Sequence, residues 1–163
     1  MKRITILVLA MVMVLSLLTA CGSNNKEILA SKKFISAAES ADYTMIIEED
    51  YDGYGTYWAG AFKFAEGVEK EEDNEIYKID YTKDQSVYNA EVEYENYIDE
   101  VKEIGGKQNS GSGKNYSFHV NSSSTEFGIA FRVEEVNLFV VAPAEYKDEI
   151  LKFFKDIGYE VKI

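Results

Sequence analysis

The sequence predicts an α+β domain, a mainly antiparallel sheet of about six or seven strands with three helices packed on one face. Three segments carry apolar residues at every third or fourth position, which is the spacing of an amphipathic helix. Other segments alternate apolar with polar residues, as half-buried strands do. No long linker divides residues 28–163. We therefore expect one domain in which the apolar helix stripes cover the apolar face of the sheet.

The first half of this region predicts one helix followed by three strands. Ser31 is a suitable N-cap, and an apolar stripe begins at Phe34 and ends at Ala41. Farther on, residues 66–75 carry six acids and one lysine, the composition of a solvated loop. The predicted elements are a helix over residues 32–40, a strand over 43–47, and a hairpin of 58–65 with 76–82.

The second half predicts a long helix, three further strands and a last helix with an edge strand. Apolar residues from Val87 to Ile104 recur at helical spacing, and Gly105 and Gly106 supply a left-handed stop. Residues 105–114 are rich in Gly, Ser, Lys and Asn, and we expect a mobile loop there. The predicted elements are a helix over residues 86–104, strands over 116–121, 126–133 and 136–142, a helix over 143–157 and an edge strand over 159–163. The strand over 136–142 is apolar on both faces, so we expect it to be central in the sheet.

Two local patterns refine this outline. Pro143, the only proline, suits the first turn of the last helix, where a missing N–H costs little. The first and last predicted helices are each followed by a strand that begins with a tyrosine, Tyr43 and Tyr159. This echo suggests a tandem helix-then-strands repeat, whose second copy would begin with the helix over residues 86–104. The alternative is that any α+β domain produces such echoes.

Composition excludes several classes of function. The chain has 163 residues and a formal net charge of −12, from 17 basic and 29 acidic residues. Nucleic acid is not expected as a partner, because phosphate binding needs a basic face. The chain has one cysteine, Cys21, and one histidine, so it can form neither an internal disulfide nor a cysteine-based zinc site. Cationic partners are favoured, although solubility alone also explains an acidic surface.

The amino terminus carries the most specific motif. Lys2 and Arg3 precede an apolar run of about fifteen residues, short for a membrane-spanning helix. Leu18-Thr19-Ala20-Cys21 follows, and then the polar residues 22–25. This pattern resembles the lipobox of bacterial lipoproteins. The alternative is an uncleaved membrane anchor with an incidental cysteine.

The resemblance implies that Cys21 is acylated with diacylglycerol and becomes the first residue of the mature chain. Two acyl chains hold a protein on a membrane firmly, whereas one is marginal. The expected parts are a signal peptide over residues 1–20, a lipidated cysteine with a short tether over 21–27, and a domain over 28–163. Loss of Lys2 and Arg3 lowers the 17 basic residues to 15 against 29 acids, a net charge of −14. We expect the domain on the extracytoplasmic face of the cell membrane.

Two neighbouring segments are candidate binding sites. Glu48, Asp50 and Asp52 precede Gly53 with the spacing of the first half of an EF-hand calcium loop. The position of the closing bidentate glutamate, however, holds Ala59, so a tight acidic turn is the alternative. Aromatic residues between glycines follow, and they could contact a partner or a sugar. The candidate contact residues are Tyr54, Tyr57 and Trp58, unless Trp58 enters the core.

Motifs for catalysis and for nucleotide binding are weak. Ser117, His119 and Asn121 share one face of a predicted strand, where a polar, solvent-facing strand is the simpler interpretation. The segment around Lys114 lacks the glycine and the hydroxyl residue that a phosphate loop needs. We therefore expect no cofactor and no enzyme activity. The predicted function is a non-catalytic binding or accessory module that contacts an envelope protein or a wall component. The alternatives are binding of a small ligand or of a cation such as calcium, and an undetected enzyme.

Overall fold

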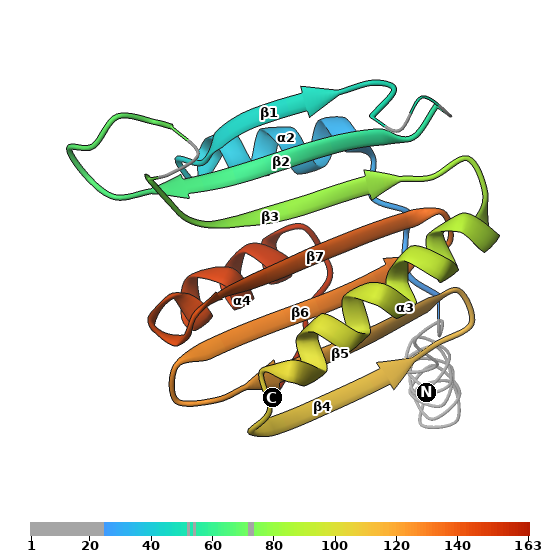
Figure 1. The fold of residues 1–163 in the computed structure, drawn as a ribbon. Helices are drawn as coiled ribbons and strands as arrows, with labels where there is room; N and C mark the ends of the chain where they lie inside the picture. Colours follow the sequence, from blue (N-terminus) through green and yellow to red (C-terminus); the bar gives the residue numbers. More distant parts are fainter. Residues whose placement is uncertain (1–24, 52, 54, 72–73) are drawn as a thin grey trace, which may run out of the picture.

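The computed structural model describes residues 25–51, 53, 55–71 and 74–163. One antiparallel sheet of seven strands runs through this region in the order β1-β2-β3-β7-β6-β5-β4 (Figure 1). This confirms the predicted α+β class and the upper estimate of the strand number. The strands are β1 (Thr44–Glu48), β2 (Tyr57–Phe64), β3 (Glu75–Lys83), β4 (Lys107–Ser112), β5 (Tyr116–Ser122), β6 (Glu126–Val133) and β7 (Val136–Pro143).

Within the described residues, three α-helices pack on the sheet. They are α2 (Ser31–Ser40), α3 (Val87–Glu103) and α4 (Lys147–Asp156), the last preceded by the 3₁₀ turn η2 (Ala144–Tyr146). Helices α2 and α4 lie behind the sheet in Figure 1 and α3 lies in front of it. We call these the back face and the front face. Among the described residues, no helix is long and apolar enough to cross a membrane.

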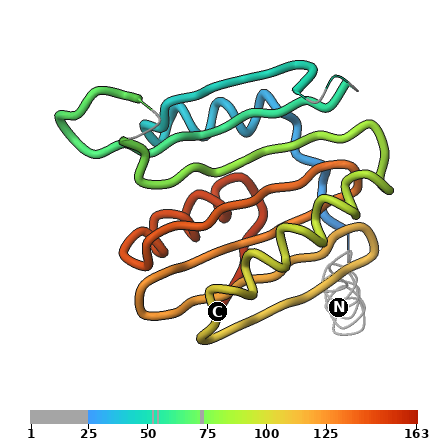
Figure 2. The backbone as a smooth tube through the Cα atoms, in the orientation of Figure 1, coloured from blue at the N-terminus to red at the C-terminus, as the bar shows by residue number. Residues whose placement is uncertain are grey.

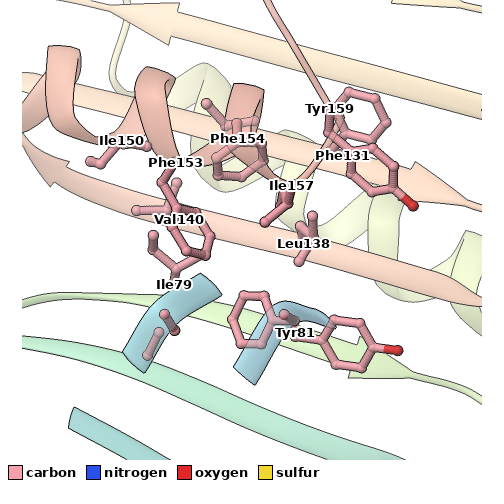
Figure 3. Close-up of a cluster of buried hydrophobic side chains, with 14 of the residues drawn as sticks. Ile79, Tyr81, Phe131, Leu138, Val140, Ile150, Phe153, Phe154, Ile157 and Tyr159 are labelled. Atoms are coloured by element: carbon pink, nitrogen blue, oxygen red, sulfur yellow. The ribbon is translucent and has the colours of Figure 1, made fainter. Parts of the chain in front are cut away.

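The main core fills the space between the back face and helices α2 and α4. Figure 3 shows Ile150, Phe153 and Phe154 of α4 over Ile79 of β3 and Val140 of β7. The core is rich in aromatic side chains, which gain area burial and offset or edge contacts together. It also holds Phe34 of α2, whose ring lies 5.2 Å from Tyr81, and Tyr159, whose ring stacks 4.8 Å from Phe131.

The second core lies under α3 on the front face, and it corrects the prediction that all three helices share one face. Tyr97 of α3 stacks on Phe139 of β7 with ring centroids 4.3 Å apart, and Val101 belongs to the same cluster as Ala130 of β6. Strand β7 was expected to be apolar on both faces, and it is buried on both. A strand of that kind needs cover on both faces, and α3 supplies the cover on the front face.

The chain order agrees with the predicted helix-then-strands repeat at the level of topology. Helix α2 is followed by the meander β1-β2-β3, which starts at one edge of the sheet. Helix α3 is followed by the meander β4-β5-β6-β7, which starts at the other edge. A two-fold axis parallel to the strands would exchange the two edges and also the two faces. Helices α2 and α3 fit this symmetry, because α2 lies on the back face and α3 on the front face (Figure 1).

Two segments differ from their predicted structure. The expected mobile loop over residues 105–114 contains strand β4, which pairs with β5 along its whole length. It lacks apolar alternation because it is an edge strand with mostly exposed side chains. The expected strand over residues 159–163 is not formed. Tyr159 and Val161 are nevertheless buried, because they fill the back core without pairing to a strand.

Smaller corrections concern the ends of helices. Pro143 closes β7 opposite Glu126, and the last helix starts only after the 3₁₀ turn. Ala30, not Ser31, is the N-cap of α2, and no side chain caps that end. The strands over 116–121 and 126–133 form as expected, but the front of β5 is not a solvent face. It lies against α3, and Asn121 is buried there.

Candidate functional site

The front face is covered only in part. Helix α3 packs on β5, β6 and β7, and among the described helices none lies over the front of β1 and β2 (Figure 1). Side chains of β2 and β3 that point to this side pair across the hairpin in register, Trp58 with Thr82 and Phe62 with Lys78. The uncovered part of the front face therefore carries aromatic and charged side chains beside each other.

Trp58 lies half-buried on this surface and belongs to neither core cluster, so the alternative that it enters the core does not hold. Its indole Nε1 donates a hydrogen bond of 2.9 Å to Oδ1 of Asp80. Its ring stacks on Tyr51 at 5.5 Å between centroids and meets Phe62 edge-on at 6.2 Å. Gly60 allows this arrangement, since a Cβ there would lie 2.7 Å from the indole ring. Aromatic packing and one hydrogen bond thus fix the orientation of the ring.

Tyr57, predicted to act with Trp58, is not brought together with it. Successive residues of a strand point to opposite faces, so Tyr57 lies on the back. There it packs against the main core, with its ring 6.0 Å from that of Tyr81. Tyr54 lies outside the described residues. Tyr51, in the described part of the loop after β1, stacks on Trp58.

Asp80 is the charged residue that the sequence analysis missed. Its side chain is buried beside Trp58, and its Oδ2 lies 3.5 Å from Nζ of Lys78. Burial raises the pKa of this carboxyl, while Lys78 and the Trp58 donor lower it in part. The same ammonium lies 5.7 Å from the centre of the Trp58 ring. The surface therefore already holds one cation between an indole ring and a carboxylate, a favourable arrangement for an ammonium group.

A groove of about 430 Å³ runs between the loop after β1 and the first half of α3. We call it the front groove. Its apolar lining is well exposed, at 58% for Tyr51, 74% for Tyr88 and 45% for Val92. Its charged lining is acidic, Asp84 and Glu93, and no lysine or arginine is among the described residues that line it. Through Tyr51 the groove continues onto the Trp58 surface.

Hydrogen bonds hold Glu93 at the inner side of the front groove. Tyr97 donates to its Oε1 at 2.8 Å, and the buried Asn137 donates to its Oε2 at 3.0 Å. The same Asn137 amide donates to the carbonyl oxygen of Ala90 at 2.9 Å. Burial and the Glu93 charge raise the pKa of Tyr97, which stays a donor at neutral pH. The carboxylate thus has a fixed position before any ligand arrives.

The acidic segment that suggested calcium forms a tight turn. The carboxylate of Asp50 accepts a hydrogen bond from the backbone N–H of Gly55, and Tyr51 N–H donates to the Thr56 carbonyl at 3.0 Å. Glu48 ends β1 and is exposed. Asp52 lies outside the described residues. Among the described residues no group of three or more His, Cys, Asp or Glu could hold a metal ion. Calcium binding that includes Asp52 stays a prediction.

A second groove, of about 490 Å³, lies on the back between α2 and α4. In it Glu149 accepts hydrogen bonds at Oε1 from Lys63 at 2.8 Å, from Tyr77 at 3.1 Å and from Tyr43 at 3.3 Å. Burial raises the pKa of Glu149, but the Lys63 ammonium and the tyrosine donors outweigh it, and the net shift is downward. Burial also raises the pKa of Tyr43 and Tyr77, so both hydroxyls are protonated donors at neutral pH.

The polar face of β5 does not form a catalytic arrangement. His119 is half-buried under the end of α3, and its Nε2 has no hydrogen-bond partner among the described residues. Burial lowers its pKa, so the ring is neutral at pH 7. Ser117 lies two residues away on the same face, beyond hydrogen-bond reach for strand spacing.

Comparisons of the chain with protein-family models, with curated proteins and with solved structures found no match. The two grooves and the sequence motifs are therefore the features of the chain that bear on its function. Cys21 and the rest of the lipobox lie outside the described residues.

Proposed function

We propose that the protein is a lipid-anchored, extracytoplasmic binding module without catalytic activity, which holds an envelope partner in the front groove. The observation that carries the proposal is the front groove itself. It joins exposed aromatic side chains, Tyr51 and Tyr88, to the carboxylates of Asp84 and Glu93 beside an uncovered part of the sheet. Exposed apolar residues gathered in a groove with a polar rim are typical of interaction sites. The lipobox resemblance, with Cys21 as the acylated residue, supports the anchor.

The charges of the groove favour a basic ligand. Asp84 and Glu93 face the groove without a lysine or arginine among its described lining residues. The mature chain is acidic overall, which attracts cationic partners over longer distances and repels anionic ones. The contact of Lys78 with both Trp58 and Asp80 is an internal example of the recognition that we propose. A segment with lysine or arginine beside an apolar residue fits this combination best.

The proposal is tested by cross-linking in intact cells of the source organism, followed by capture through a C-terminal tag and mass spectrometry. Cys21→Ala is the unanchored control. We expect one envelope protein to be enriched with the anchored chain, and its yield to fall in Tyr88→Ser. Val68→Ser is the matched control, because Val68 is also exposed, at 43%, but lies in the loop after β2, at the opposite end of that strand from the front groove. Equal yields from all four proteins would contradict the proposal.

The back groove supports a second candidate, binding of a small ligand. Two ion pairs line this groove, Lys63–Glu149 at 2.8 Å and Lys152–Asp156 at 2.7 Å. A small molecule with both a positive and a negative group could exchange with these pairs. A ligand of the folded state raises the melting temperature. Thermal-shift screening of the chain from Gly22 onward, with amino acids and with calcium, tests this candidate and the cation alternative together.

A further inference from the structure

The segment that leads from the lipidation site into the domain is fixed to the fold by side chains. The amide of Asn115 accepts a hydrogen bond from Lys26 N–H at 2.9 Å and donates one to the Lys26 carbonyl at 2.9 Å. The two bonds hold one residue of the segment as a neighbouring strand would. We call this contact, together with the tyrosine contacts of the next paragraph, the clamp.

Two buried tyrosines complete the clamp. The Tyr159 hydroxyl accepts from Leu29 N–H at 2.8 Å and donates to the Glu27 carbonyl at 2.8 Å. Tyr81 donates to the Leu29 carbonyl at 2.9 Å, and the Leu29 side chain is buried in the back core. Residues 26–29 are therefore part of the folded domain, and Lys26 is the first residue that these contacts hold.

The clamp and the front groove lie at the same end of the sheet. Strand register places Tyr116, Val133, Val136, Lys83 and Tyr57 in one row across five strands. At this end Glu134 N–H bonds to the Asn115 carbonyl at 3.0 Å, and Asp84 N–H bonds to the Glu135 carbonyl at 2.9 Å. Four strand spacings separate the ends of this row, about 19 Å. Figure 2 shows the N-terminal segment entering at the end where α3 begins.

The length of the tether determines which end of the domain can face the bilayer. Five residues lead from Cys21 to Lys26, and a fully extended chain of that length spans at most about 18 Å. Strand β2 has eight residues and is about 24 Å long. If the loop after β2 lay against the bilayer, Lys26 would lie farther from the membrane than the tether reaches. The end with the clamp and the front groove therefore faces the membrane.

We propose that the clamp holds the front groove at the membrane-proximal end of the domain, where it binds a basic extracytoplasmic segment of an integral membrane protein. This inference depends on the proposed anchor at Cys21. Two partners that are both held in one membrane meet at a raised effective concentration, which favours such an occupant over a freely diffusing one. The acids of the groove, Asp84 and Glu93, disfavour the anionic lipid headgroups as the occupant.

The orientation is tested with the lipidated protein in phosphatidylcholine vesicles that carry a headgroup spin label. Because the Cys21 thiol is acylated, Tyr88→Cys and Val68→Cys each provide one site for a fluorophore. We expect stronger quenching at position 88 than at position 68. A Gly-Ser insertion of about thirty residues after Gly22, which spans about 30 Å, should remove the difference. Asn115→Ala removes the two side-chain hydrogen bonds to Lys26, so it should reduce the difference in quenching between the two positions.

The occupant is tested with a photo-reactive residue at position 88 or at position 68, in cells. We expect products at position 88 whose linked peptide belongs to an extracytoplasmic, basic segment of a membrane-spanning protein. High salt and Glu93→Gln should reduce their yield, with the melting temperature of Glu93→Gln measured beside it. Products with lipid or wall polymer alone, or equal yields at the two positions, would overturn this part of the inference.

The failure of the inference and the failure of the proposed function give different results. Mass spectrometry of the mature chain shows whether Cys21 carries acyl chains. An unacylated chain in the soluble fraction would overturn the anchor and, with it, both proposals. An acylated chain with equal quenching at positions 88 and 68 would overturn the orientation and leave the proposed function standing.

Discussion

The indole Nε1 of Trp58 donates a hydrogen bond of 2.9 Å to the buried carboxylate of Asp80, across the β2–β3 hairpin. The bond joins the only tryptophan of the chain to a charge that has little contact with water. It fixes the indole on the uncovered part of the front face, next to Tyr51 and the front groove. A rigid aromatic side chain loses little entropy when it contacts a partner, so this placement favours binding.

Trp58→Phe removes the donor and keeps most of the ring packing. We expect a loss of about 1–3 kcal/mol in the free energy of unfolding, because the Asp80 charge loses a partner that water cannot replace. Urea unfolding at pH 7 measures this. In Asp80→Asn the same Trp58 change should cost less, so in the double-mutant cycle the two changes together should cost less than the sum of the single changes. A loss below about 0.5 kcal/mol in Trp58→Phe would show that the bond contributes nothing.

Gly60→Ala tests the close approach of the rings over β2. A Cβ at this position would lie 2.5 Å from the Phe62 ring and 2.7 Å from the Trp58 ring, so both must move. Overpacking of this kind costs about 1–3 kcal/mol. The fluorescence of Trp58, the only tryptophan, reports the local change directly. We expect emission at longer wavelength in the folded variant, and an unchanged spectrum with unchanged stability would contradict the described geometry.

Glu149 should make stability depend on pH. Its pKa is lowered in the folded state, because the hydrogen bonds from Lys63 and the two tyrosines outweigh the effect of burial. A carboxyl with a lowered pKa in the folded state contributes stability above its ordinary pKa of about 4.3, and this is lost as pH falls through the lowered value. Glu149→Gln should therefore be less stable than the parent at pH 7, and the difference should shrink in acid.

The control for Glu149 is Asp156→Asn. Asp156 forms an exposed ion pair with Lys152 on α4, and exposed pairs contribute little to stability. Urea unfolding of the parent and of both variants at pH 7 and at pH 3 gives the comparison. If Glu149→Gln and Asp156→Asn behaved alike at pH 7, the hydrogen-bond network around Glu149 would have no special role.

Local patterns predicted most of the elements. The helix predicted over residues 86–104 forms as α3, and Ser86 is its N-cap, since its side chain accepts from Asn89 N–H at 3.2 Å. Alternation predicted β5 and β6, and the both-sided apolar run predicted β7 at the centre of the sheet. These features depend on residues close in sequence, where periodicity and capping chemistry are informative.

The face that each helix covers could not be predicted, because an apolar stripe shows that a helix is buried without showing against what. The helical spacing of Tyr97 and Val101 is the same whether the helix covers one face of the sheet or the other. The signal was present in β6 and β7, where Ala130 and Phe139 point away from the back core and need cover of their own. Strand β4 was missed for a different reason, because an exposed edge strand has no apolar alternation to detect.

The candidate site was predicted only in part. The sequence indicated the aromatic loop and Trp58, and it gave no sign of Asp80, Glu93 or Tyr88. Asp80 is a charged residue on the front face of β3, whose back face carries aromatic residues. Charged residues in such positions are commonly solvated. Asp80 is buried because the Trp58 ring lies over Gly60 of β2 and reaches Asp80 on β3. This contact joins two strands. Tyr88 and Glu93 join the site only because α3 crosses the sheet next to the loop after β1.

The central claim, that the front groove binds an envelope partner, is tested most directly by quantitative capture from cells that express the parent, Tyr88→Ser or Val68→Ser at equal levels. The account predicts that the partner recovered with the parent is lost in Tyr88→Ser and kept in Val68→Ser, with unfolding free energies within about 0.5 kcal/mol of one another. Equal recovery with Tyr88→Ser, at equal expression and stability, would contradict it.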